Sequence, residues 1–205
     1  MRRVGMIVTL TALLSVTASA GFAGTLNAHP DAYGGVTGSV AFNNGAGISG
    51  AIDFAVFTAA DFNANFSGLG YVPSDPLVYT YQLLVEGRSG ITKFIVYLNG
   101  NPANHIGSFD LGGQAPSVSQ FICCPEGAQW SFALPGVAGG TTSWGLAFSS
   151  PNSPLFGSAE VFAESSSTVV AGVPSPSTIL APVPEPSSLL FVGSGVLFLL
   201  GKRRR

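Results

Sequence analysis

The last stretch of the chain decides in which surroundings the rest must fold. Pro184-Glu185-Pro186 interrupts regular structure because proline lacks a backbone N–H, and residues 187–201 after it carry no charge. As a helix this run would be about 22 Å long, short of the ~30 Å hydrocarbon core of a bilayer. Four of the eight basic residues follow directly, namely Lys202, Arg203, Arg204 and Arg205. Such a cluster stays on the cytoplasmic side, so the pattern predicts a short transmembrane helix over about 187–201 with a stop-transfer signal.

The order of these parts resembles the PEP-CTERM sorting signal of Gram-negative bacteria, over residues 183–205. Pro184, Glu185 and Pro186 match the sorting tripeptide. The resemblance implies recognition by an exosortase, a membrane protease-transpeptidase, and cleavage near the tripeptide. It further implies release or transfer to the outer surface, often alongside exopolysaccharide production. The residues alone leave a second interpretation open, in which the tail is a plain membrane anchor.

The start of the chain has the pattern of a secretory signal peptide. A charged Met1-Arg2-Arg3 precedes an apolar run from Val4 to Val16, and Ala18-Ser19-Ala20 forms an A-x-A cleavage site. The predicted signal peptide covers residues 1–23, with Ala18 and Ala20 as cleavage determinants and a second cut site after Ala23. Export places the residues between the two terminal segments beyond the inner membrane.

The exported region is acidic. Between Gly24 and Val183 two basic and nine acidic residues give a formal charge of -7. Such a surface repels phosphate backbones, so we expect no nucleic-acid partner.

Residues 24–164 have the pattern of an all-β domain. Apolar residues alternate with others in several short segments separated by Gly, Pro and Asn, which predicts an antiparallel β-sandwich of jelly-roll or immunoglobulin-like type. A closed barrel is the alternative. Strands are expected at 38–42, 51–58, 77–85, 91–99, 105–111, 117–122, 129–134, 143–149 and 158–164. No interior window shows helical periodicity.

The strands at 77–85 and 91–99 flank the turn sequence Gly87-Arg88-Ser89-Gly90. Two such segments joined by a short glycine-containing loop predict a β-hairpin. After residue 164 the composition changes to serine and proline. Residues 165–183 are therefore predicted to be an extended linker that could hold the domain ~60 Å from the membrane, with a last strand at Thr168–Ala171 as the alternative.

Two motifs with the spacing of ligand-binding loops are better explained as turns. Gly45–Gly50 fits G-x-G-x-x-G, but a strand-like sequence follows it, whereas a dinucleotide site needs a helix there. Asp61–Asn65 matches the first half of a calcium loop, but Phe66 and Val72 replace its glycine and its glutamate. We assign no metal ion and no cofactor.

The two histidines, His29 and His105, do not suggest a catalytic site. His105, Ser108 and Asp110 include the residue types of a hydrolase triad, but residues 105 and 108 should point to opposite faces of a strand. No G-x-S-x-G elbow is present, and no catalytic residue is assigned.

The only cysteines, Cys123 and Cys124, are adjacent. Export to an oxidising compartment favours a vicinal disulfide, which needs a strained turn, and Pro125 fits a turn. Free thiols and an intermolecular bridge remain the alternatives.

The sequence therefore predicts an exported, non-enzymatic protein of the cell surface or extracellular matrix, processed by an exosortase after a transient stay in the inner membrane. Exopolysaccharide or another matrix component is the expected surface partner. One alternative is a carbohydrate- or partner-binding sandwich in which exposed rings form a stacking platform, with four candidates: Tyr33, Tyr71, Trp130 and Trp144. A secreted hydrolase is the second alternative, and it requires converging carboxylates or a metal.

Overall fold

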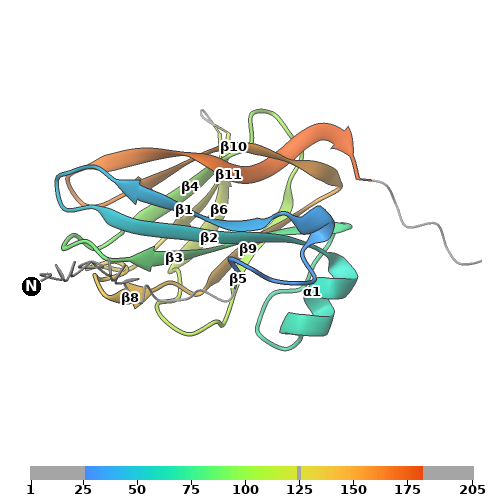
Figure 1. Cartoon of the computed structure of the whole chain (residues 1–205), viewed down its shortest axis with the longest axis horizontal. Coiled ribbons are helices and arrows are strands. Elements are labelled where there is room, and N and C mark those ends of the chain that lie inside the picture. The colour runs from blue at the N-terminus through green and yellow to red at the C-terminus, as the bar shows by residue number, and fades with distance from the viewer. Residues whose placement is uncertain (1–25, 124–125, 182–205) are drawn as a thin grey trace, which may run out of the picture.

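Two antiparallel sheets form the protein in the computed structural model, which describes residues 26–123 and 126–181 (Figure 1). The first sheet has the order β1-β2-β3-β9-β5, and a short β8 also pairs with β3. Its strands are β1 (Thr37–Asn43), β2 (Ser49–Thr58), β3 (Leu77–Val85), β5 (Asn104–Phe109), β8 (Thr141–Thr142) and β9 (Gly145–Ser150). The predicted antiparallel all-β architecture is confirmed.

The second sheet has the order β11-β10-β4-β7-β6. Its strands are β4 (Lys93–Tyr97), β6 (Val118–Ile122), β7 (Gly127–Ser131), β10 (Asn152–Phe162) and β11 (Ser167–Leu180). The strand ladders form two separate sheets, which fits a sandwich better than the closed barrel.

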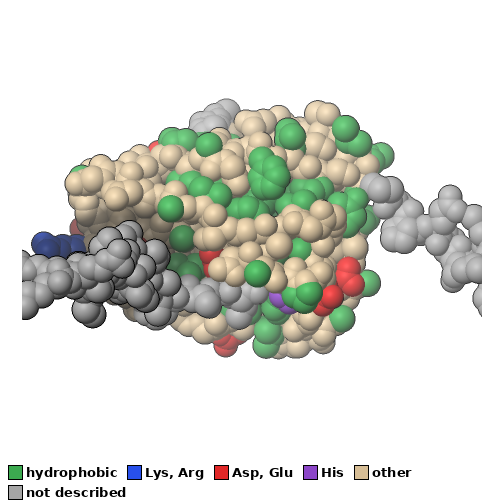
Figure 2. All heavy atoms as spheres, viewed as in Figure 1, with side chains coloured by type: hydrophobic (Ala, Val, Ile, Leu, Met, Phe, Trp, Pro, Cys, Tyr) green, Lys and Arg blue, Asp and Glu red, His purple; other side chains and the backbone are tan. Residues whose placement is uncertain are grey.

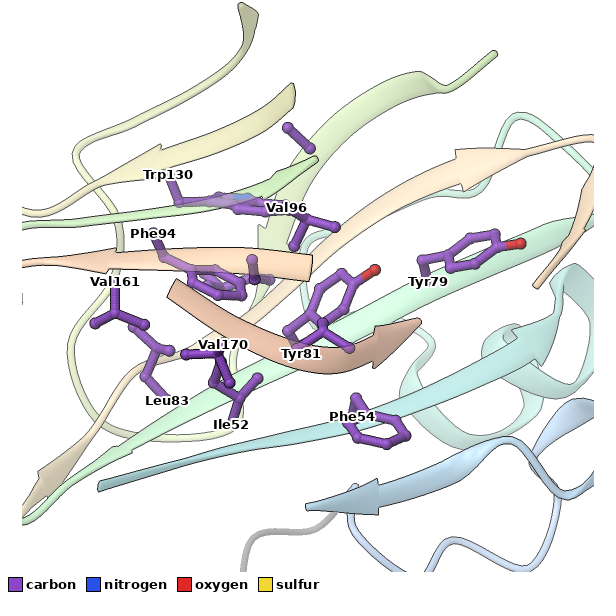
Figure 3. Close-up of a cluster of buried hydrophobic side chains, with 14 of the residues drawn as sticks. Ile52, Phe54, Tyr79, Tyr81, Leu83, Phe94, Val96, Trp130, Val161 and Val170 are labelled. Carbon is purple, nitrogen blue, oxygen red and sulfur yellow. The ribbon is translucent and has the colours of Figure 1, made fainter. Parts of the chain in front are cut away.

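The core lies between the sheets and is built from alternate residues of each strand. In β3 the predicted face is buried, with Tyr79, Tyr81 and Leu83 each 0 % exposed. From the second sheet Phe94 and Trp130 meet them, and the Tyr81 ring lies 5.8 Å from Phe94 and 6.0 Å from Trp130 (Figure 3). The indole N–H of Trp130 donates to the Gly107 carbonyl of the opposite sheet at 2.8 Å, so this buried polar group is satisfied.

The outer face of the first sheet carries a second apolar cluster. The helix α1 (Ala59–Phe66) buries Phe62 and Phe66 there, against Phe57 and Phe109. Because both faces of the sheet are covered in this region, all nine residues of β3 are buried.

Two expectations from the sequence are wrong at this level. Helix α1 occupies the half-calcium-loop sequence, for which a turn is expected; Thr58 caps it by accepting from the Asp61 N–H at 3.1 Å. The predicted hairpin does not form either, because β3 pairs with β2 and β9 while β4 pairs with β10 and β7. The glycine-containing loop instead crosses between sheets, and Gly87 passes so close to the β1–β2 turn that a Cβ would lie 2.2 Å from the Gly47 carbonyl oxygen.

The predicted linker is the third correction. Residues 167–180 form β11, an edge strand that pairs with β10 along its length, from Phe162↔Ser167 to Asn152↔Leu180. The alternative strand at Thr168–Ala171 covers only part of this length. The folded domain therefore extends to the end of β11, well beyond residue 164.

Candidate functional site

The end of β11 is the place where the folded domain meets the predicted sorting tail. Leu180 is paired with Asn152 at the start of β10, and the Ala181 N–H donates to the Pro151 carbonyl at 2.8 Å. The described chain stops at this point, where β11 leaves the sheet in Figure 1. The fixed structure thus reaches to within three residues of Pro184.

Side chains of the core hold β11 in place where its prolines cannot. Pro174 and Pro176 have no N–H to donate to the ladder. The Tyr81 hydroxyl donates to the Pro174 carbonyl at 2.6 Å, and the Asn152 amide donates to the Ser177 carbonyl. The Tyr79 hydroxyl donates to the Asn152 backbone carbonyl at 2.8 Å, which fixes the start of β10.

Burial raises the pKa values of the Tyr79 and Tyr81 hydroxyls above the ordinary value for tyrosine. Both groups therefore stay protonated and act as donors. The alternation in the sequence places Tyr79 and Tyr81 in the core but does not predict their hydrogen bonds, because it identifies a buried face and not the partner of a hydroxyl. The one available signal is the pair of tyrosines among aliphatic residues of a buried strand, since a buried Tyr O–H usually finds a partner.

Two adjacent apolar side chains are exposed at the end of β11. Ile179 is 69 % exposed and Leu180 is 68 % exposed. The register shifts between Pro154↔Pro176 and Asn152↔Leu180, so the chain bulges at Ser177–Ile179. The space-filling view in Figure 2 shows hydrophobic atoms on the surface next to the point where the described chain ends.

The two basic residues of the described region lie at the opposite end of the sandwich. Lys93 begins β4 and pairs with Phe162 at the far end of β10, and its amino group lies 4.7 Å from the centre of the Phe162 ring. Arg88 precedes it in the crossing between the sheets. Asp75 accepts from the side chain of Asn104, which pairs with Ser149. Ser149 lies three residues before Asn152, the partner of Leu180, so Asp75 is near the β11 end. Within residues 26–123 and 126–181, the β11 end thus carries no cation.

His105, Ser108 and Asp110 do not form a triad. The His105 ring stacks on Tyr71 with 5.1 Å between ring centres, and Asp110 accepts from the Gly112 N–H at 2.8 Å. Among the described residues no hydrogen bond joins the three side chains. The backbone at His105 has φ 43° and the register with β9 is irregular there, so simple strand alternation does not apply.

The other candidate ligand residues also have structural roles. The Gly45–Gly50 sequence forms the turn between β1 and β2 and the first two residues of β2. The Asn44 side chain accepts from the Ala46 and Ile48 N–H groups in this turn. His29 lies against Phe57, at 4.9 Å between ring centres. No group of three or more His, Cys, Asp or Glu side chains in the described part of the chain could hold a metal ion.

The proposed stacking platform is not formed. Trp130 is 0 % and Tyr71 is 5 % exposed, so these two rings cannot stack on a ligand. Tyr33 and Trp144 are partly buried. Cys123 is exposed, whereas Cys124 lies outside the described residues, so the disulfide stays a prediction.

The predicted targeting residues lie outside the described residues at both ends. These are Ala18 and Ala20 of the signal peptide, Pro184, Glu185 and Pro186 of the tripeptide, and Lys202, Arg203, Arg204 and Arg205 of the stop-transfer signal. Over the range that the structure describes, no helix is long and apolar enough to cross a membrane.

Comparison with protein families matches residues 182–205 to the PEP-CTERM protein-sorting motif. The match begins directly after Ala181, the last described residue, and contains the tripeptide and the basic cluster. No curated protein and no solved structure matches the chain. The chain thus carries a PEP-CTERM motif directly behind its β-sandwich.

Proposed function

We propose that this protein is a non-enzymatic cargo, sorted by an exosortase through its tail and delivered to the cell surface or extracellular matrix. The PEP-CTERM motif supports export, a membrane-anchored precursor and exosortase-dependent sorting. The observation that carries the proposal is the sharp boundary between domain and motif: β11 ends at Leu180 and the motif begins at residue 182. Cleavage near Pro184–Pro186 would therefore release the sandwich with all of its strands.

The contacts of the candidate residues support a cargo role better than a catalytic one. The histidines pack on aromatic rings, and the Asp110 carboxylate accepts a hydrogen bond from the Gly112 N–H in a turn. Asp61 accepts from the Thr58 hydroxyl at 2.6 Å and stabilises the start of α1. These contacts give the two histidines and both carboxylates structural roles. The partner at the surface is proposed to be exopolysaccharide or another matrix component.

The test replaces Pro184, Glu185 and Pro186 together by alanine in the native host. We expect the variant to accumulate in the inner membrane with its tail intact, because the enzyme no longer recognises the cut site. The matched control replaces the neighbouring Ser187 and Ser188 by alanine and should be processed normally. Intact mass of the protein from membrane, envelope and medium gives both termini.

Normal release of the triple-alanine variant would reject exosortase recognition. A wild-type product that begins near Gly21 or Gly24 and ends near Pro184–Pro186 would support two-ended processing, and added mass on the new C-terminus would identify the surface partner. A wild-type protein that keeps Arg205 and stays in the inner membrane would show that the tail is a plain membrane anchor and would reject exosortase processing.

A further inference from the structure

The distance between the folded domain and the bilayer is set by the few residues after β11. Ala181 is fixed to Pro151 by its backbone hydrogen bond. From Ala181 to Ser187, where the uncharged run begins, the chain makes six steps and can span at most about 20–22 Å when fully extended. About 5–7 Å of that lies within the headgroup layer. The β11 end of the sandwich is therefore held close to the membrane surface in the precursor.

Two exposed apolar side chains lie at this end of the domain. Ile179 and Leu180 are adjacent, and each is about two-thirds exposed. Ile179 belongs to the bulge at Ser177–Ile179, and Leu180 follows it in the pair with Asn152. The Ser177 hydroxyl oxygen fixes the bulge by accepting from the Ile179 N–H at 3.1 Å. These two side chains lie closer to the anchor, along the chain, than any other exposed large apolar residue of the described region.

We propose that Ile179 and Leu180 form a membrane-contact surface that seats the folded domain on the bilayer while the tail is anchored. The occupant of this apolar surface is the lipid headgroup and acyl-chain boundary. The inference rests on the membrane-anchored precursor of the proposed function, and it adds where and how the domain sits. The chain length favours the bilayer over a partner protein, because the tether brings the surface to the lipid and leaves little room between them.

Charge and tether together make this contact temporary. The basic Arg88 and Lys93 lie at the far end of the sandwich, so attraction to anionic lipids adds nothing at the β11 end. Two apolar side chains give only weak membrane binding alone, and stable anchoring needs a second signal. The tail supplies that signal by raising the effective concentration of the surface at the lipid. Once the tail is cut, the domain leaves the membrane.

The test places a fluorescent reporter at the proposed contact. The full-length precursor is reconstituted in vesicles of phosphatidylethanolamine and phosphatidylglycerol, with or without bromine on the acyl chains. The variant Leu180→Trp is compared with Leu134→Trp, since Leu134 is also exposed, by 70 %, but precedes Pro135, which lies against Gly90 at the opposite end. The native Trp130 and Trp144 give the same background in both variants.

We expect brominated lipid to cause a loss of emission from Leu180→Trp and no loss beyond background from Leu134→Trp. If Leu180→Trp folds poorly, Ile179→Trp replaces it. Absence of quenching in a folded variant would overturn the proposal. A blue shift of Leu180→Trp without bromine quenching would mean that protein covers the surface, for instance a second copy, and would overturn it as well.

The role of the tether is tested by lengthening it. A flexible 20-residue Gly/Ser insert between Ala181 and Pro182 has a root-mean-square reach of about 25 Å, and it should abolish the quenching of Leu180→Trp. Quenching that persists with the insert would overturn the claim that the contact depends on the short tether.

No exosortase is present in these vesicles, so the result is separate from the test of sorting. Quenching of Leu180→Trp together with normal release of the triple-alanine variant would keep the membrane contact and reject the sorting. Normal processing of the wild type without quenching of Leu180→Trp would keep the sorting and reject the membrane contact.

Discussion

The hydroxyl of Tyr81 should contribute to stability far more than its place in an apolar core suggests. Replacing Tyr81 by phenylalanine keeps the ring, which packs against Phe94 and Trp130, and removes only the donor to the Pro174 carbonyl. Tyr81 is 0 % exposed, so no solvent can replace the lost hydrogen bond without opening the sandwich.

The expected loss follows from the cost of a buried hydrogen bond. Removing one partner of such a bond costs about 1–3 kcal/mol, because the other group stays desolvated. Taking a middle value of about 2 kcal/mol and about 2–4 °C per kcal/mol for a domain of this size, the Tm should fall by about 4–8 °C. The loss should fall on β11 first, since the hydroxyl holds that edge strand.

The assay is thermal and urea unfolding of residues 24–183 followed by circular dichroism. The control is Tyr97→Phe, which also removes one hydroxyl, but one that donates to the half-buried Glu160 carboxylate. A hydrogen bond that water can partly replace contributes about 0.5–1.5 kcal/mol, so the Tm of Tyr97→Phe should fall by less than that of Tyr81→Phe. Equal Tm values for the two variants would refute the assignment of β11 as a strand fastened by Tyr81.

Three further predictions concern other parts of the fold. Burial, followed by the hydrogen bond to Glu160, raises the pKa of Tyr97 to about 12 from 10.0. The contribution of this hydroxyl to the free energy of unfolding is therefore present below pH 10 and lost as the pH rises toward 12. Urea unfolding across this range should show a smaller loss of stability for Tyr97→Phe than for the wild type. Thr58→Ala removes the cap of α1 and should cost about 1 kcal/mol, and an unchanged urea midpoint would contradict the capping role. Gly172 is the extra residue of a bulge in β11, at φ 83°, so Gly172→Ala should cost about 1–2 kcal/mol; Gly172→Asn should cost less, and the reverse order would count against backbone strain as the cause.

Local alternation predicted the strands other than β8 and β11, but it could not predict their partners. The buried face of β3 was readable because Tyr79, Tyr81 and Leu83 recur with period two. Its neighbours were not readable, since pairing with β2 and β9 depends on packing between distant segments. The glycines after β3 fit a turn equally well when that turn joins two sheets.

The last strand was missed because its composition argues against a strand. Proline is confined to edges, first positions and bulges of sheets, and β11 is an edge strand with a bulge. Its prolines were therefore compatible with pairing, but only the position of β11 in the sheet shows it. Helix α1 was missed for a related reason: Phe62 and Phe66 are four residues apart, a spacing too short to establish a helical period.

The junction itself was half predictable. The tripeptide and the basic cluster could be read directly from the sequence, and the family comparison agrees with them. The exposed Ile179 and Leu180 could not be identified, because an apolar pair in a serine- and proline-rich stretch has no period to assign it to a face.

The position of β11 at the end of the domain also orders events in time. Synthesis reaches β11 after every other strand, so a chain complete to β10 lacks the edge of its second sheet. At that stage Tyr81 has no Pro174 carbonyl to bind, and β10 has an open edge. The second sheet is complete only when the chain has been made through β11. Because the sorting motif follows β11 directly, the domain can complete its fold only shortly before the motif itself is synthesised.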